Sequence, residues 1–216
     1  MRVVEIFNSI DGEGCRAGKL ATFIRTAGCN LRCSYCDTSY AQEMAQGQDM
    51  TVEQICEQVK EIGCHNITLT GGEPLLHCEA PELVKVLCRY GQVNIETNGT
   101  MPIEPFLSLK NTIITMDYKC PSSGCESMMR LENLELLRPW DVLKFVVSED
   151  DFRAVREVLL YYQIRAQVYL SPVFGKVELP KIVGFVKRLH KEGLAENVRM
   201  QLQMHKIIWD PQKRGV

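Results

Sequence analysis

The sequence predicts an α/β fold in which about six parallel strands are joined by crossover helices. The chain has 216 residues, 45% hydrophobic and 24% charged, which are ordinary proportions for one globular domain over residues 1–216. Short segments rich in β-branched and aliphatic residues recur along it, and amphipathic helical patterns separate most of them. Polar clusters follow several of these segments, where parallel sheets place their ligands.

The expected elements alternate in order. Strands are expected at 22–26, 66–70, 93–97, 112–117, 142–147 and 166–170. The first helix begins near Thr51, because Thr51 and Gln54 have the spacing of a capping box. Pro81 can open a second helix and Ser148 can cap a third. Apolar residues at helical spacing over 182–189 predict a fourth. Periodicity alone leaves open whether the sheet is open or curls into a partial barrel.

The charge balance excludes some classes of partner. Lys and Arg number 25 and Asp and Glu 27, so the formal net charge is −2. Such a chain has no broad basic field for nucleic acid or an anionic membrane. No uncharged apolar run approaches the roughly 20 residues that span a bilayer, and the first residues lack a signal-peptide core. We therefore expect a cytoplasmic protein with no nucleic-acid or membrane partner.

The chain contains ten cysteines, which we expect to be reduced in such a protein. Most are interpreted as small buried residues, and Cys56 and Cys88 lie on apolar helix faces. Cys29, Cys33 and Cys36 differ, because they form a Cys-x3-Cys-x2-Cys loop directly after the strand at 22–26. Three thiolates can hold three irons of a four-iron cluster and leave the fourth open. A structural zinc site remains an alternative, but it would need a distant fourth ligand.

This loop resembles the signature of the radical S-adenosylmethionine (radical SAM) superfamily. The resemblance implies a partial, TIM-like barrel with a [4Fe-4S] cluster on Cys29, Cys33 and Cys36, whose open iron binds S-adenosylmethionine. It places Tyr35, Cys36 and Asp37 against the adenine of that cofactor. In this superfamily the cluster reduces the cofactor, and a 5′-deoxyadenosyl radical then takes a hydrogen atom from the substrate.

Two later segments agree with this resemblance. Residues 70–74, Thr-Gly-Gly-Glu-Pro, resemble the GGEP element of the superfamily, which places Gly72 and Glu73 near the methionine amino group. Glu96 and Asn98 stand in a segment whose polar side chains reach the ribose or methionine of the cofactor. Taken alone, the first segment is also an ordinary strand-to-helix turn and the second an Asn-Gly turn.

The resemblance implies further cofactor contacts at Asp117, Tyr118, Lys119 and Ser171. Many relatives have Ser-Pro-Lys at the first three of these positions, and only the lysine is retained here. The segment 120–125 that follows has a Cys-x4-Cys spacing. Since two thiols are too few for a second cluster, we interpret it as a flexible loop.

Residues 7–14, 23–29 and 209–216 resemble the 7-carboxy-7-deazaguanine synthase family, and the likeness runs nearly end to end. It implies a lyase that rearranges 6-carboxy-5,6,7,8-tetrahydropterin, with ring contraction and loss of ammonia, to 7-carboxy-7-deazaguanine. The family serves queuosine and other deazapurine pathways, and Mg²⁺ assists. A homodimer and an electron donor such as flavodoxin or ferredoxin are family-level expectations.

The resemblance also assigns substrate contacts. These are the backbone of Ile10, Asp11 and Gly12, together with Glu13, Arg25, Thr70 and Val216. The guanidinium of Arg25 would meet the substrate carboxylate in a fork-like geometry, and carboxylates suit the N–H groups of a pterin. Thr38 matches a hydroxyl ligand of Mg²⁺, a hard ion that prefers oxygen. Asp11 departs from the glutamine common in the family. His205 is expected to pack or to bridge to the tail rather than to ligate metal.

Two other functions remain open at this point. A radical SAM activase that makes a glycyl radical on a partner protein would share the cysteine loop. It would not need Arg25 or the segment 11–14. A zinc-dependent binding module without turnover is the alternative from a different class.

Overall fold

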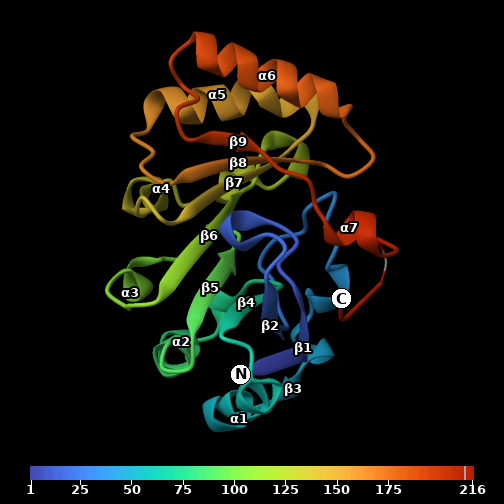
Figure 1. Cartoon of the computed structure of the whole chain (residues 1–216), viewed down its shortest axis with the longest axis vertical. Coiled ribbons are helices and arrows are strands. Elements are labelled where there is room, and N and C mark those ends of the chain that lie inside the picture. The colour runs from blue at the N-terminus through green and yellow to red at the C-terminus, as the bar shows by residue number, and fades with distance from the viewer. Residues whose placement is uncertain (212) are drawn as a thin grey trace.

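In the computed structural model, which describes residues 1–211 and 213–216, the strands form one mixed sheet of nine. Their order is β3-β1-β2-β4-β5-β6-β7-β8-β9 (Figure 1). The strands are β1 (Arg2–Ile10), β2 (Leu20–Thr26), β3 (Gln48–Asp49), β4 (Asn66–Gly71), β5 (Gln92–Thr97), β6 (Thr112–Tyr118), β7 (Val142–Val147), β8 (Gln167–Pro172) and β9 (Val198–Met200). Neighbours from β2 to β9 are parallel, whereas β1 is antiparallel to both β2 and β3.

Helices follow most of the parallel strands. They are α1 (Val52–Ile62), α2 (Ala80–Leu87), α3 (Glu104–Leu107), α4 (Glu132–Leu136), α5 (Phe152–Tyr161), α6 (Leu179–Lys191) and α7 (His205–Ile208). Helices α1 to α6 lie along the outer side of the curved sheet, and α7 lies apart from them near the C-terminus (Figure 1). The curvature of the sheet agrees with the partial barrel expected from the family resemblance. No helix among the described residues is long and apolar enough to cross a membrane.

The predicted helix signals are present in the structure. Gln54 N donates to Thr51 Oγ1 at 3.3 Å and Thr51 N donates to Gln54 Oε1 at 2.9 Å, which completes the capping box of α1. Gly63 ends the same helix with φ 73°, a left-handed conformation that glycine adopts without strain. Ser148 and Asp151 form a second capping box before α5. Local sequence thus fixes where these crossover helices begin.

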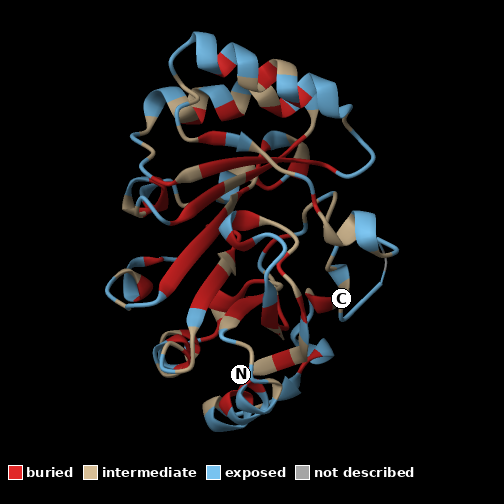
Figure 2. Ribbon diagram, viewed as in Figure 1, coloured by how far each residue is buried: buried red, intermediate tan, exposed pale blue. Residues whose placement is uncertain are grey.

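The alternation of the strands separates an apolar face from a polar one. Ile67, Leu69 and Ile95 are fully buried within the main core that the helices cover. Thr68 and Asn94, their neighbours on β4 and β5, point to the opposite face and are also buried. Figure 2 shows that burial is concentrated in the strands, while the outer helices expose one side. The polar inner face is therefore where a ligand site can form.

The expected count of about six strands was too low. The six expected segments correspond to β2, β4, β5, β6, β7 and β8, and the sequence did not identify β1, β3 and β9 as strands of the sheet. β1 was missed because its burial does not alternate cleanly, and it pairs with β2 across a register shift near Val3. β3 and β9 have two and three residues, which is too short to give a periodic signal.

Candidate active site

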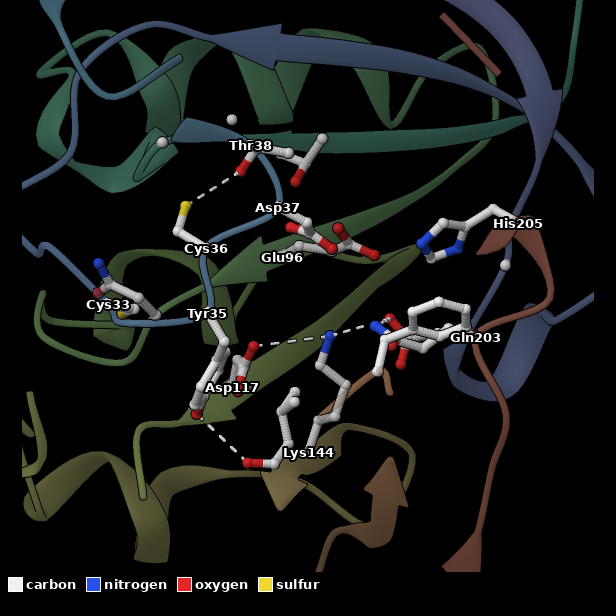
Figure 3. A pocket seen from close by; sticks show the side chains of 18 of the residues that line it. Cys33, Tyr35, Cys36, Asp37, Thr38, Glu96, Asp117, Lys144, Gln203 and His205 are labelled. Atoms are coloured by element: carbon white, nitrogen blue, oxygen red, sulfur yellow. Dashed lines mark hydrogen bonds and ion pairs between the residues drawn. The ribbon is translucent and has the colours of Figure 1, made fainter. Parts of the chain in front are cut away.

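A pocket of about 490 Å³ lies at the carboxyl ends of the parallel strands. It brings together most of the side chains that the sequence singled out, although they come from segments far apart in the chain (Figure 3). Those that line it are Ile10, Gly12, Glu13, Arg25, Cys29, Cys33, Tyr35, Cys36, Asp37, Thr38, Thr70, Gly72, Glu96, Asn98, Asp117, Lys119 and Val216. Asp11, Glu73, Tyr118 and Ser171 do not line it.

Three half-buried, free cysteines lie at one end of the pocket. Two N–H groups point at the first of them: Leu31 N lies 3.4 Å and Asn98 Nδ2 3.7 Å from Cys29 Sγ. Burial raises the pKa of the Cys29 and Cys33 thiols, so each needs a nearby positive charge to become a thiolate. Thiolates that accept N–H bonds are the ligands that iron–sulfur clusters use.

The thiols fit a cluster better than a single ion. Among residues 1–211 and 213–216, no three His, Cys, Asp or Glu side chains are close enough together to hold one metal ion. A [4Fe-4S] cluster gives each cysteine its own iron, so its ligands need not converge on one point. Cys29, Cys33 and Cys36 all line this pocket and would hold such a cluster.

The turn after β4 fits closely against the cysteine loop. A Cβ at Gly72 would lie 2.2 Å from Gly28 O, so only glycine allows this approach. Glu73 N also donates to Gly28 O at 2.7 Å. The backbone carbonyls of this turn can therefore come close to a ligand held by the cysteine loop.

Glu73 does not point into the pocket, and the structure places it beneath the turn. Its fully buried carboxylate accepts from Leu75 N at 3.0 Å, Thr97 Oγ1 at 2.8 Å and Asn98 N at 2.6 Å. Burial raises its pKa to about 7 even though these donors act in the opposite direction. The Glu73 side chain thus joins the turn after β4 to the end of β5 and orients Asn98.

The substrate contact expected at Asp11 involves its backbone, and its side chain does not line the pocket. Its side chain is buried on the inner side of the sheet, where Oδ2 lies 2.9 Å from Arg16 Nε and Oδ1 accepts from Thr68 Oγ1 at 2.8 Å. Burial raises the pKa of Asp11 to about 6, while Arg16 lowers it. The carboxylate therefore anchors the segment that presents Gly12 and Glu13, both of which line the pocket.

Strand alternation separates Tyr118 from its neighbours. Asp117 and Lys119 line the pocket, whereas the Tyr118 side chain lies on the other face of β6. Its hydroxyl donates to Glu126 at 3.2 Å, and its ring centre lies 5.3 Å from that of Phe145. The expectation that Tyr118 contacts the cofactor therefore has no support in its side-chain position.

A chain of partly buried charges crosses the floor of the pocket (Figure 3). Lys144 Nζ lies 3.3 Å from Glu13 Oε2 and 3.6 Å from Asp117 Oδ2, and Lys119 Nζ lies 3.0 Å from the same Asp117 oxygen. Ser171 Oγ donates to Glu13 Oε1 at 2.7 Å, so Ser171 acts through Glu13 rather than at the pocket wall. Burial would raise the pKa of Glu13, but Lys144 and Ser171 outweigh it and hold that pKa below its usual value.

The C-terminal residues form the opposite wall. Lys206 Nζ lies 2.8 Å from Asp37 Oδ2, which ties this wall to the cysteine loop. Gln203 Nε2 donates weakly to Glu13 Oε2 at 3.5 Å. His205 packs so closely on Gly12 that a Cβ there would lie 2.2 Å from its Nδ1. Burial lowers the pKa of His205, so its ring is neutral at pH 7.

Comparisons with known proteins now identify the family. The radical SAM superfamily model matches residues 23–137. A 7-carboxy-7-deazaguanine synthase of Clostridium acetobutylicum is 44% identical over 222 residues, covering 100% of this chain and 99% of the relative. One of Methanospirillum hungatei is 40% identical and covers 98% and 86%. The chain belongs to the 7-carboxy-7-deazaguanine synthase family of the radical SAM superfamily.

Solved structures agree on the fold. The crystal structure of QueE from Escherichia coli matches with a TM-score of 0.70 and 24% identity over 94% of each chain. Streptococcus suis SuiB, bound to its precursor peptide SuiA, matches with a TM-score of 0.62 and 13% identity, covering 83% of this chain and 48% of that one. As a radical SAM family member, the chain uses a [4Fe-4S] cluster and S-adenosylmethionine, and this excludes the zinc-module alternative.

Several residues that line the pocket were not predicted from the sequence as site residues. Lys144, Gln203 and Lys206 all line it. Lys144 could have been noticed, because it is a lone charge within the otherwise apolar strand β7. Gln203 and Lys206 gave no such signal, because Gln203 precedes and Lys206 lies in the four-residue helix α7, which is too short to give a periodic pattern. The segment 120–125 is also packed rather than open, since Cys120 and Cys125 are both buried.

Proposed function

We propose that this chain is a 7-carboxy-7-deazaguanine synthase that converts 6-carboxy-5,6,7,8-tetrahydropterin to 7-carboxy-7-deazaguanine with loss of ammonia. The observation that carries the proposal is that one pocket holds the three thiols at one end and Arg25, Glu13 and Val216 elsewhere on its wall. The end-to-end likeness to synthases of this name supports it. A glycyl-radical activase would not need this set of charged groups beside the thiols.

At the cofactor end, we assign cluster binding to Cys29, Cys33 and Cys36. The bound cluster and S-adenosylmethionine supply a 5′-deoxyadenosyl radical that takes one hydrogen atom from the substrate. The pocket positions of Gly72, Glu96, Asn98, Lys119 and the backbone of residues 35–37 support their role in holding the cofactor. Asp117 positions Lys119 through their 3.0 Å ion pair.

At the substrate end, the guanidinium of Arg25 binds the substrate carboxylate. Its Nε already meets Glu5 Oε1 at 2.7 Å, which leaves the outer donors for a ligand. Glu13 stays ionised at neutral pH and accepts from pterin N–H groups, as does the terminal carboxylate of Val216. Thr70 lies on the same pocket wall, and Thr38 supplies a hydroxyl oxygen for Mg²⁺.

The test is direct. The protein is reconstituted anaerobically with iron and sulfide and incubated with S-adenosylmethionine, Mg²⁺, dithionite and the tetrahydropterin. We expect 7-carboxy-7-deazaguanine by mass, none from Cys29→Ala, and a large loss in Arg25→Lys, which keeps the charge but not the fork. A Thr38→Val variant should lose the response to Mg²⁺. Formation of 5′-deoxyadenosine without this product would refute the substrate assignment.

The wider setting is also proposed from the family. We assign the product to queuosine or another deazapurine pathway, the assembly to a homodimer, and the electron supply to a flavodoxin or ferredoxin. Sedimentation of the holoenzyme tests the dimer. Replacing dithionite by each reduced carrier, and comparing product formation, tests the donor.

A further inference from the structure

Tyr40 connects two parts of the substrate end that lie far apart in the chain. It stands in a short 3-10 turn (Ser39–Ala41) between the cysteine loop and α1. Its hydroxyl donates to Glu5 Oε1 at 2.9 Å, and the same oxygen accepts from Arg25 Nε at 2.7 Å. Its ring contacts the guanidinium of Arg214, whose Cζ lies 4.0 Å from the ring centre. One side chain therefore contacts both the Arg25 network and the tail.

The Tyr40 hydroxyl restricts the position of Arg25 through their shared acceptor, Glu5 Oε1. Glu5 accepts from two donors on one oxygen, so Tyr40 limits where its carboxylate can lie. The Arg25 guanidinium is also within 5.7 Å of the Phe7 ring centre and 5.8 Å of the Tyr40 ring centre. These contacts restrict the orientation of the guanidinium and keep Arg25 on the pocket wall.

The Tyr40 ring restricts the position of the C-terminal residues through its contact with Arg214. Arg214 is exposed, yet its guanidinium is seated on the Tyr40 ring, and the next residue, Gly215, takes a left-handed φ of 69°. Val216 then reaches the pocket wall. Figure 1 shows the C-terminus beside the blue segments of the first quarter of the chain. Terminal residues are ordered only when such contacts offset their conformational entropy.

We propose that Tyr40 and Arg214 are positioning residues: the Tyr40 hydroxyl sets Arg25 through Glu5, and the Tyr40 ring sets the Val216 carboxylate through Arg214. This inference rests on the proposed function, because it assigns Arg25 and Val216 to the substrate. It adds that one aromatic side chain aligns the two groups. Its two halves are separable, because Tyr40→Phe removes the hydroxyl contact and keeps the ring.

The tail half is tested without any substrate. Carboxypeptidase Y is added to the reconstituted holoenzyme, and the loss of Val216 is followed by intact mass. We expect Arg214→Gln and Tyr40→Leu to raise the rate of release roughly three- to tenfold, Arg214→Lys to raise it less, and Tyr40→Phe to leave it near the wild-type rate. Arg188→Gln is the matched control, since Arg188 also stacks on aromatic rings but on α6. Equal rates in all variants would overturn the tail half.

The Arg25 half is tested by ligand affinity. For the 6-carboxy substrate we expect Tyr40→Phe and Arg214→Gln each to raise KM roughly fivefold with kcat within twofold, and the affinity for S-adenosylmethionine to stay unchanged. With tetrahydropterin lacking the carboxylate, Tyr40→Phe should bind as well as wild type, because Arg25 then has no partner. Arg214→Gln should still bind more weakly. An equal loss for both ligands in Tyr40→Phe would overturn this half.

The two levels of inference can fail separately. If the wild-type holoenzyme binds neither pterin, the proposed substrate is wrong, and the release of Val216 alone decides whether Tyr40 and Arg214 hold the tail. If the pterins bind and Tyr40→Phe matches wild type for both, the substrate stands and the positioning role of the hydroxyl is refuted.

Discussion

Two walls of the pocket are built in different ways. The motif side, defined as residues 26–38, 70–74 and 96–99, is held by backbone contacts and buried acceptors such as the Glu73 carboxylate with its three donors. The C-terminal segment, residues 201–211 and 213–216, has backbone bonds near its start, from Gln201 N to Leu170 O and from Met204 N to Gly12 O. Farther along it is held by side chains, including Lys206 on Asp37 and Arg214 on Tyr40. The cofactor end is thus part of the sheet, whereas the substrate end is closed by a segment added to it.

This difference has a functional consequence. A cluster and its cofactor need ligands fixed relative to one another, which sheet ends provide. A substrate must enter and a product must leave, which a wall held by a few partly exposed side chains permits. We therefore expect changes on the motif side to abolish the chemistry, and changes in the C-terminal segment to weaken substrate binding without losing the cofactor.

The largest effect should come from the cysteine loop. Cys33→Ala removes one of the three thiols that line the pocket, so the reconstituted protein should lose its brown absorption, most of its iron and all product formation. Cys88→Ala is the matched control, because Cys88 caps the C-terminal end of α2 and packs against the core. A Cys33→Ala protein that keeps full iron content would contradict the assignment of the motif side.

The next effect probes the charges between the two walls. Lys144→Met leaves Glu13 and Asp117 without a shared cation, and we expect the free energy of unfolding of the apoprotein to fall by about 3 kcal/mol in urea. Lys176→Met should change it by less than about 0.5 kcal/mol, because Lys176 lines the pocket but is exposed. Adding Glu13→Gln to Lys144→Met should recover part of the loss. Equal effects of the two lysine changes would show that the Lys144 ion pairs do not stabilise this region.

The difference between the motif side and the C-terminal segment also explains what could be predicted from the sequence. The cysteine loop was identified because its three thiols are close in sequence and their chemistry follows from their spacing. The Gly71–Gly72 turn was identified from its resemblance to the GGEP element of the superfamily. The directions of two side chains were not predicted from the sequence: strand alternation turns the Tyr118 side chain away from its neighbours, and Arg16 pairs with the Asp11 carboxylate.

The C-terminal segment gave little signal, because several of its side-chain contacts join residues more than 150 positions apart. Gln203 meets Glu13, Lys206 meets Asp37, and Arg214 meets Tyr40. None of these pairs has a periodicity or a motif, so only the folded chain brings the partners together. The tail was assigned to the substrate from family resemblance alone, and the residues that hold it were not foreseen.

Glu73 and Glu13 should give opposite pH dependences of stability. Burial raises the pKa of Glu73 from 4.5 to about 7, so its folded form binds more protons, and stability falls as the pH rises through that window. Lys144 and Ser171 overcome burial and lower the pKa of Glu13, so its contribution is present above 4.5 and is lost as the pH falls through the lower folded pKa.

The measurement is the free energy of unfolding of the apoprotein as a function of pH. Wild type should lose about 2 kcal/mol more than Glu73→Gln between pH 5 and 7. Below pH 4.5, wild type should decline more steeply than Glu13→Gln. If Glu73→Gln instead keeps the full wild-type slope between pH 5 and 7, the buried carboxyl is ionised throughout, and its three donors outweigh its burial.

The smallest expected effect tests whether the motif side and the C-terminal segment act separately. Deleting Val216 moves the terminal carboxylate back by one residue, and we expect about a tenfold weaker Kd for the tetrahydropterin, equal to about 1.4 kcal/mol. The free energy of unfolding, the iron content and the affinity for S-adenosylmethionine should all stay at wild-type values, because no contact of the motif side depends on Val216. Val216→Ala is the control, since it keeps the carboxylate in place and should bind substrate nearly normally. If the deletion also lowers the cofactor affinity, the two walls are coupled, and the substrate end cannot be treated as a separate closure.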